Sequence, residues 1–577
     1  MCRHGIEPRN LHDWDADAVK PGGRQHGGRR YREVSPGPTR SQTRCMYRTF
    51  LCENREVPRL SAADGAADRI GKARGRNPMT HGHGKSDGPV VPAKRSNKAA
   101  RAVAESVEER GPTKGNTNQQ NMSRTQSRNH GVPSALERVR EVATRDKEAK
   151  FTALLHHVTV DRLRQAFRML RRSAAAGVDG VTWRQYAEGL EGNLENLHAK
   201  LHRGAYRAKP SRRVFIPKSD GRMRPLGIAA LEDKLVQRAV TEVLNAIYEA
   251  DFLGFSYGFR PGRSQHMALD ALAAGIRMKK VNWVLDADIR GFFDAIDHEW
   301  LRRILEHRIA DRRLLRLIQK WLSAGVIDKG VKTRTTTGSP QGATISPLLA
   351  NVFLHYVFDL WVVQWRRRHA HGEMIVVRYA DDIVLGFKHE DDARRFKSEL
   401  VARMAKFGLE LHPDKTRLMR FGTLASNQCR ERGEGKPGTF DFLGFTHICG
   451  KTRKGRFKLV RLTSRKRMAI RLKAIRVALH RGRHRPVPVQ GAWIRRVVGG
   501  YFAYHAVPTN GHRLQVFRDE VTKAWIRVLR RRSQRHRMTW SRLHSLAERW
   551  IPRPRILHPW PDDRFLSATT RGRSPVR

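Results

Sequence analysis

The stretch that most constrains this chain is "VVRYADDIVLGF", from Val376 to Phe387, where Asp381 and Asp382 interrupt a run typical of a buried β-strand. Apolar residues flank a polar centre that is too short for anything but a tight reversal, so the segment is predicted to be a β-hairpin with both aspartates at its tip. Asp favours turns on its own account, so the pair alone is weak evidence of a site. Because an ionised carboxylate in apolar surroundings is costly without compensation, the hairpin calls for a nearby cation.

A second strand-like run ends in carboxylates further upstream, in "NWVLDADIRGFFDAIDHEWL". It is followed by a predicted helix over about 299–323. If the two runs are neighbouring strands of one sheet, Asp288 lies beside Asp381 and Asp382. Such a cluster repels itself without cations, and Mg²⁺ prefers oxygen ligands. Two ions could activate an attacking 3′-hydroxyl and stabilise a leaving pyrophosphate, so the reaction class indicated is nucleotidyl transfer.

The charge balance indicates a polyanionic partner. The 577 residues include 113 Lys and Arg against 55 Asp and Glu, a formal net charge of +58. Nucleic acid is the expected partner, because Lys and Arg that neutralise phosphates release counterions. The five cysteines form no C-x-x-C pair, which argues against a zinc ribbon or a disulfide framework. With no long apolar run and no secretory signal, we expect a cytoplasmic protein, nucleoid-associated as a ribonucleoprotein, with no membrane partner.

Composition divides the chain into four segments. Residues 1–130 are rich in Gly, Arg, Pro, Ser and Asn, and are predicted to be a disordered basic arm or a translated leader, with Met79 and Met122 as alternative starts. Helices and strands alternate over 134–450. Residues 451–565 are predicted to form a basic helical domain and 566–577 a basic tail. Together, these last two segments hold 34 Lys and Arg against 5 Asp and Glu. Aromatic residues among these arginines, namely Trp493, Tyr501, Phe502, Tyr504 and Trp525, suit RNA, although for most of them a place in the core of the domain is the favoured interpretation.

Two further motifs point to a nucleotide. In "RRVFIPKSDGRMRPLGI", an Asp-Gly pair favours a hairpin whose Lys218, Arg222 and Arg224 could fold over a triphosphate, although such a hairpin taken alone is more often a solvated turn. In "GSPQGATISPLLANVF", glycines let the backbone approach a ligand, and Ser346 is expected to cap the helix that follows.

In "LELHPDKTRLMRF", Lys415 follows a predicted strand and a proline turn. A cation there could orient primer or phosphate, and an ordinary surface lysine is the equal alternative.

These motifs together resemble a known family. "YADD", "GSPQGATISPLLANVFLHYVFD", "SYGFRPGRSQHMAL" and "FDFLGFTH" stand in the order and spacing of a bacterial group II intron-encoded reverse transcriptase/maturase, over about 134–565. The resemblance implies an α+β, right-hand polymerase. Its fingers would come from about 134–280, its palm would be a ferredoxin-like split β-α-β, and an α-helical thumb, or maturase domain X, would span about 455–560.

The resemblance also assigns roles to residues. Asp288, Asp381 and Asp382 match the catalytic ligands of two Mg²⁺ ions, and Phe293 matches the residue that screens the 2′-position of the incoming nucleotide. Nucleotide contacts are implied for Lys218, Arg224 and Gln341. Asp294 and Asp297 are expected to serve local structure, because they lie beyond the end of the strand.

The implied partners are group II intron RNA, a DNA target and primer, and deoxynucleoside triphosphates, and the assembly could be a homodimer. The protein would assist splicing of its intron and then copy the inserted intron into cDNA. No H-N-H endonuclease is expected, so priming would come from elsewhere, such as a replication-fork strand. The alternatives are a splicing-only maturase, or a domesticated reverse transcriptase of a diversity-generating or CRISPR-linked system.

Overall fold

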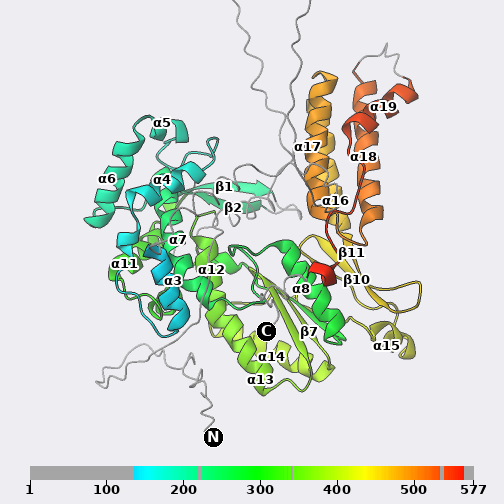
Figure 1. Ribbon diagram of the computed structural model, residues 1–577, viewed down its shortest axis with the longest axis horizontal. Helices are drawn as coiled ribbons and strands as arrows, with labels where there is room; N and C mark the ends of the chain where they lie inside the picture. The colour runs from blue at the N-terminus through cyan, green and yellow to red at the C-terminus, as the bar shows by residue number, and fades with distance from the viewer. Residues whose placement is uncertain are drawn as a thin grey trace, which may run out of the picture. The chain divides into compact units, whose positions relative to one another are not determined.

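A computed structural model describes residues 135–217, 223–328, 330–333, 336–339, 342–532 and 539–564, all of which belong to one compact unit (Figure 1). The predicted basic arm 1–130 and basic tail 566–577 lie outside the described residues. Lys218, Arg222 and Gln341 also lie outside them.

Helices dominate the first part of the described chain. They are α3 (Ala135–Arg145), η3 (Leu155–His157), α4 (Val160–Met169), α5 (Trp183–Glu188), α6 (Leu190–His202) and α7 (Leu231–Asp251). Side-chain caps fix two of the helix starts, since Thr159 accepts from the N–H of Arg162 and Thr182 forms a capping box with Gln185. Helix α7 is buried along nearly its whole length and packs against α3, α4 and α12 (Ser346–Leu354). Helix α7 is therefore the central helix around which these N-terminal helices pack.

A small sheet projects from these helices. Strands β1 (Ser211–Pro217) and β2 (Met223–Ile228) form an antiparallel hairpin in which Ile216 pairs with Arg224. Strands β4 (Val326–Asp328) and β5 (Val331–Thr333) complete the order β2-β1-β4-β5. The hairpin expected from the sequence is confirmed at its strands.

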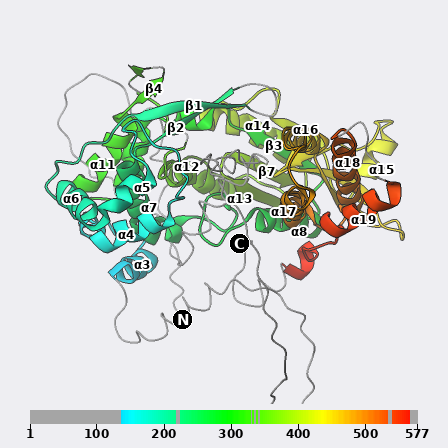
Figure 2. The same ribbon diagram turned by 90° about the horizontal axis from the view of Figure 1, so that it is seen from above.

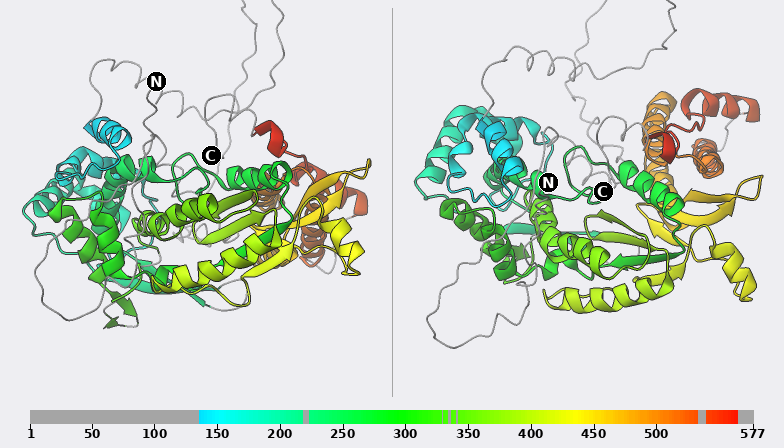
Figure 3. Two further views of the ribbon diagram at one scale, coloured as in Figure 1. Left: turned by 90° about the horizontal axis from the view of Figure 1, so that it is seen from below. Right: turned by 60° about the horizontal axis from the view of Figure 1, so that its bottom comes forward.

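A second four-stranded sheet has the order β6-β7-β3-β8, with every neighbouring pair antiparallel. Its strands are β3 (Trp283–Asp288), β6 (Met374–Tyr379), β7 (Asp382–Phe387) and β8 (Arg417–Arg420). Helix α8 (Gln265–Met278) packs on β6 and β7, while α14 (Glu390–Ala405) packs on β3 and β7 from the other face (Figure 3). Burial on both faces explains why these strands are continuous apolar runs in sequence.

The helix predicted over 299–323 is two helices. The first is α10 (His298–Glu306) and the second is α11 (Arg312–Ser323). Asp311 starts the second helix by accepting from the N–H groups of Arg313 and Leu314. The same carboxylate accepts from the N–H groups of residues 154 and 155, so a distant segment, invisible to local periodicity, fixes the break.

Helix α12 continues through a π-helical segment, η4 (His355–Asp359), into α13 (Leu360–Arg368). By length and composition alone, this continuous 23-residue helix could cross a membrane, but 78% of its most apolar window is buried inside the protein. That burial is typical of a core helix.

The C-terminal part begins with a three-stranded sheet of order β11-β10-β9 and the short helix α15 (Ala425–Glu431). Its strands are β9 (Phe440–Phe442), β10 (Phe445–Lys451) and β11 (Phe457–Thr463). The helices that follow lie together in Figure 2: α16 (Arg465–Arg481), α17 (Val487–His505), α18 (Gly511–Arg530) and α19 (Trp540–Trp550). Their apolar side chains form a hydrophobic core of their own. Trp493, Tyr501, Phe502 and Trp525 lie in that core, so for these aromatic residues the core interpretation is confirmed.

Candidate active site

Two of the predicted metal ligands face each other across one strand pair. Asp288, the last residue of β3, pairs directly with Asp382, the first residue of β7. On the other side of β7, Tyr379 pairs with Asp382, which leaves Ala380 and Asp381 as the two-residue turn of the predicted hairpin. Ala380 has a φ of 57°, a left-handed conformation that is uncommon for a residue with a side chain. The predicted convergence of the two strands is confirmed.

Lys415 reaches the same point from a third segment. Its Nζ lies 2.5 Å from Oδ2 of Asp288, and the N–H of His412 donates to the Asp288 carbonyl oxygen at 2.8 Å. Lys415 lies in the turn that leads into β8, and the predicted strand before it is reduced to a single bridge between Leu411 and Ile289. The lysine supplies positive charge beside a carboxylate at the strand end.

The carboxylate oxygens at this strand end suit a hard divalent cation, although they do not form a complete metal site. Within the described ranges, no three His, Cys, Asp or Glu side chains converge closely enough to hold a metal ion. Asp288 and Asp382 nevertheless present oxygen ligands, the kind that Mg²⁺ prefers, from opposite strands. Two residues before Asp288 on the same strand, burial above all raises the pKa of Asp286 to about 7. Arg417 opposes this rise and the Asp288 charge adds to it.

Phe293 lies next to this strand end in the short helix α9 (Phe292–Ala295), which follows Gly291. Its side chain is largely buried and packs edge-to-face against Phe292, with ring centroids 5.5 Å apart. The N–H of Ser339 donates to the Phe293 carbonyl oxygen at 2.7 Å. This hydrogen bond holds the predicted glycine loop, which includes Gly338 and Ser339, against the turn that carries Phe293.

Gly338 makes that close contact possible. Its φ is +85°, and a Cβ at this position would lie 3.0 Å from both the Cα and the carbonyl oxygen of Asp294. The Gly338 N–H donates to the Ile296 carbonyl oxygen at 2.7 Å, and Nε2 of His298 lies 2.6 Å from the Gly338 carbonyl oxygen. A side chain would separate the loop from the turn.

Two local predictions about helix starts have different outcomes. Asp297 caps α10 by accepting from the N–H of Trp300 at 2.8 Å, so its structural role is confirmed. Ser346 does not cap α12, because Ile345 occupies the cap position and Pro347 lies in the first turn. The Ser346 hydroxyl instead accepts from the Ser339 hydroxyl at 2.7 Å, which ties the helix to the glycine loop.

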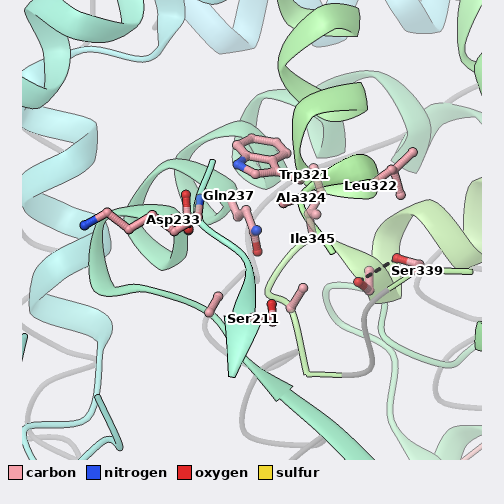
Figure 4. A pocket seen from close by; sticks show the side chains of 12 residues that line it. Ser211, Asp233, Gln237, Trp321, Leu322, Ala324, Ser339 and Ile345 are labelled. Atoms are coloured by element: carbon pink, nitrogen blue, oxygen red, sulfur yellow. Dashed lines mark hydrogen bonds between the residues drawn. The ribbon is translucent and has the colours of Figure 1, made fainter. Parts of the chain in front are cut away.

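A small cavity lies behind the glycine loop, lined by residues from β1, α7, α11 and α12 (Figure 4). Its volume of about 10 Å³ is close to the room of one water molecule, so it is too small for a nucleotide. Burial raises the pKa of Asp233 to about 6, although this carboxylate accepts from the Tyr206 hydroxyl and the Lys209 N–H. Gln237 accepts from the Thr344 N–H at 2.9 Å, so the cavity wall also supports the loop.

Arg224 has its side chain partly buried on β2, paired in register with Ile216. Because Lys218 and Gln341 lie outside the described residues, the triphosphate and template contacts implied for the hairpin and the glycine loop stay predictions.

Arg378 belongs to the polar centre of the stretch "VVRYADDIVLGF", but it is a fully buried residue of strand β6 and does not lie in the turn. It binds Asp359 and Asn351 and lies directly beneath the turn that carries Asp381. The available signal was an arginine inside an apolar strand, because a buried charge requires a partner. The identity of the partners, 19 and 27 positions upstream in the chain, could not be read from local pattern.

Known proteins match this chain in sequence. The family described as reverse transcriptase (RNA-dependent DNA polymerase) matches residues 216–447. Protein YkfC of Escherichia coli is 34% identical over 312 residues, which cover 48% of this chain and 81% of YkfC. The chain belongs to the reverse transcriptase family. It is therefore an RNA-directed DNA polymerase, which copies a nucleic-acid template with deoxynucleoside triphosphates, and the family implies divalent metal ions.

Two other relatives of this reverse transcriptase are encoded by introns. The group II intron-encoded protein LtrA of Lactococcus lactis is 35% identical over 236 residues, which cover 40% of this chain and 39% of LtrA. An uncharacterised 91 kDa protein in the cob intron of Schizosaccharomyces pombe is 40% identical over 162 residues, covering 28% of this chain and 20% of that protein.

Proposed function

We propose that this reverse transcriptase is a group II intron-encoded maturase that binds its own intron RNA, assists splicing and copies the inserted intron into cDNA. The observation that carries the proposal is the similarity to LtrA, a group II intron-encoded protein. The basic helical bundle formed by α16 to α19 supports it, because a phosphate backbone is best bound by such a surface.

For the fold, we propose a right-hand polymerase with the domain limits 134–450 and 451–565. The sheet of β3, β6, β7 and β8 would be the palm, since β7 lies between β3 and β6 and is antiparallel to both, as in a split β-α-β unit. The helices and the β1–β2 hairpin would be the fingers. The bundle would be the thumb, and its separate hydrophobic core supports this assignment.

For the active site, we propose that Asp288, Asp381 and Asp382 hold two Mg²⁺ ions. When bound, such ions activate a 3′-hydroxyl and stabilise developing charge on pyrophosphate. The contribution of the chain is to hold two of these carboxylates face to face at a strand end, with Lys415 beside Asp288. Phe293 would exclude a 2′-hydroxyl by its bulk, and Lys218, Arg224, Gln341 and Lys415 would contact nucleotide or primer.

The proposed partners are group II intron RNA and a DNA target and primer. We place the protein in the cytoplasm, as part of a nucleoid-associated ribonucleoprotein. A homodimer is the assembly that we propose to test.

The test is protein-dependent splicing of the intron RNA that surrounds the reading frame. Purified protein should accelerate splicing at near-physiological Mg²⁺, and the Asp381→Asn, Asp382→Asn double variant should lose primer extension while keeping splicing. Reversing exposed charges on α16, as in Lys466→Glu with Lys473→Glu, should weaken intron binding at least tenfold. Reversal of the exposed Arg394 and Arg395 on α14 is the matched control.

Extension without any effect on splicing, and without preference for the intron over an unrelated RNA, would reject the maturase proposal in favour of a domesticated reverse transcriptase. Splicing without extension by the unaltered protein would indicate a splicing-only maturase.

A further inference from the structure

A buried charged network lies directly beneath the turn that carries the catalytic aspartates. Arg378 and Asp359 both have fully buried side chains and form a two-point contact, with Nε to Oδ1 at 2.7 Å and Nη2 to Oδ2 at 2.5 Å. Burial by itself raises the pKa of Asp359, but Arg378 and His355 together outweigh burial and hold this pKa below its ordinary value. Buried ion pairs are often no more stabilising than apolar residues of similar volume, so this pair calls for a role other than stability.

The remaining arginine nitrogen contacts the turn itself. Nη1 of Arg378 donates to the Ala380 carbonyl oxygen at 3.2 Å and to Oδ1 of Asn351 at 2.9 Å. The Ala380 carbonyl belongs to the peptide bond that joins the left-handed turn residue to Asp381. The guanidinium therefore fixes the orientation of that peptide, and with it the point from which Asp381 leaves the backbone.

Asn351 connects Arg378 to Gly258, a second residue that contacts the turn. Its Nδ2 donates to the Gly258 carbonyl oxygen at 2.6 Å. Gly258 lies against the turn so closely that a Cβ there would be 2.2 Å from the Ala380 nitrogen and 2.8 Å from the Tyr379 carbonyl carbon. The turn therefore contacts both the Arg378 guanidinium and the Gly258 backbone.

The π-helical segment η4 explains how one helix supplies both partners of the arginine. Residues seven apart lie within about 20° of one face of an α-helix, whereas residues eight apart, like Asn351 and Asp359, are offset by about 80°. A π-helical turn accommodates one extra residue, which returns Asp359 to the face of Asn351. Such insertions are frequent at functional sites. Here the insertion brings an amide and a carboxylate to one guanidinium.

We propose that Arg378 is a positioning residue for catalysis. Anchored by Asp359 and Asn351, it holds the Ala380 turn in its left-handed conformation, so that Asp381 and Asp382 are placed for cation binding before any cation arrives. The inference concerns the polymerase reaction alone and does not depend on the maturase proposal, because extension on an unrelated template reports it.

The test compares two arginines in similar surroundings. Arg308 is also fully buried and pairs with buried Asp251, but its other hydrogen bonds go to the carbonyl oxygens of Ala143, Asp146 and Ala149. Lysine keeps the charge of either arginine and removes the planar fork. Arg378→Lys and Arg308→Lys should therefore lose similar stability, while only the former should disturb the aspartate turn.

Three quantities are measured at a temperature where both variants are folded by circular dichroism. They are the single-turnover extension rate, the dissociation constant for Mn²⁺ by calorimetry without nucleic acid, and amide hydrogen exchange of the peptide spanning 376–387. For Arg378→Lys we expect a rate at least 100-fold lower, Mn²⁺ binding at least fivefold weaker and exchange at least tenfold faster, with primer–template affinity within threefold. Arg308→Lys should stay within twofold on all of these quantities.

Equal losses of extension rate in the two variants would overturn the proposal. It would also be overturned if Arg378→Lys extends primers slowly while its Mn²⁺ binding and amide hydrogen exchange are unchanged. If Arg378→Lys does not fold, Asn351→Asp decides the question. It keeps the acceptor for Arg378 but loses the donor to Gly258. Weaker Mn²⁺ binding by folded Asn351→Asp supports the network, and unchanged binding rejects it.

Discussion

Asp288 and Asp382 occupy directly opposed positions of the antiparallel strands β3 and β7. Side chains opposed in this way have Cβ atoms about 5 Å apart, so one cation can contact both carboxylates. Only one positively charged contact to Asp288 is observed among the described residues, the Lys415 amine at 2.5 Å. The pair is thus held in place by the backbone pairing of the two strands.

Replacing either opposed aspartate should abolish polymerisation. Asp288→Asn and Asp382→Asn each remove one negative charge from the strand end, and we expect primer extension to fall at least 1,000-fold, a loss of about 4 kcal/mol of transition-state stabilisation. Asp414→Asn is the control, since the carboxylate of Asp414 is 88% exposed two residues from His412. Extension by either Asp288→Asn or Asp382→Asn at a tenth of the normal rate would be incompatible with a ligand role.

Removing the lysine should strengthen cation binding. The Lys415 amine and a divalent ion compete for the same Asp288 carboxylate, so Lys415→Ala should bind Mg²⁺ a few times more tightly and show a larger rise in melting temperature when Mg²⁺ is added. Chelation with EDTA should lower the melting temperature of this variant below that of the unaltered protein. A smaller Mg²⁺-induced rise than in the unaltered protein would show that the lysine assists the ion and does not compete with it.

Phe293 should control sugar selectivity. Phe293→Ala opens space next to the strand end, so we expect ribonucleotide incorporation relative to deoxyribonucleotide to rise tenfold or more, together with a stability loss of about 3 kcal/mol from the buried ring. Phe292→Ala is the matched control, because its ring is equally buried but packs against Phe353 in the core. The prediction fails if both variants change selectivity alike.

The protein should be acid-labile. Burial above all lowers the pKa of four histidines to about 3: His266, His307, His447 and His505. Unfolded histidines titrate near 6.5, so the stability that these groups contribute is complete above about pH 6.5 and is lost as the pH falls toward 3. At pH 5 the loss for each histidine is about 2 kcal/mol.

Urea unfolding between pH 7 and pH 5 measures this loss. His447→Gln should make stability depend less on pH by about one proton per unfolding event, whereas the exposed His544→Gln should not change the dependence. Equal stability of the unaltered protein at the two pH values would contradict the expectation.

Local pattern was sufficient for the two strands and the hairpin that carry Asp288, Asp381 and Asp382. The apolar runs that end at Asp288 and surround Asp381 predict two strands and a hairpin, because strand periodicity and turn chemistry act within a few residues. Periodicity failed at 299–323, where Asp311 interrupts the helix by binding residues 154 and 155. The helix-start signature of Ser346 and Pro347 placed the cap wrongly, because the Ser346 hydroxyl binds Ser339 and does not cap the helix.

The sequence by itself determined the chemistry: carboxylates at strand ends, glycines where the backbone must come close, and an excess of positive charge suited to nucleic acid. Only the tertiary structure decided which groups meet. Lys415 reaches Asp288 across 127 positions, and Arg378 finds Asp359 and Asn351 because a π-helical turn rotates them onto one face. The physical reason is that a buried charge must be compensated, but any distant part of the chain that the fold brings near can compensate it.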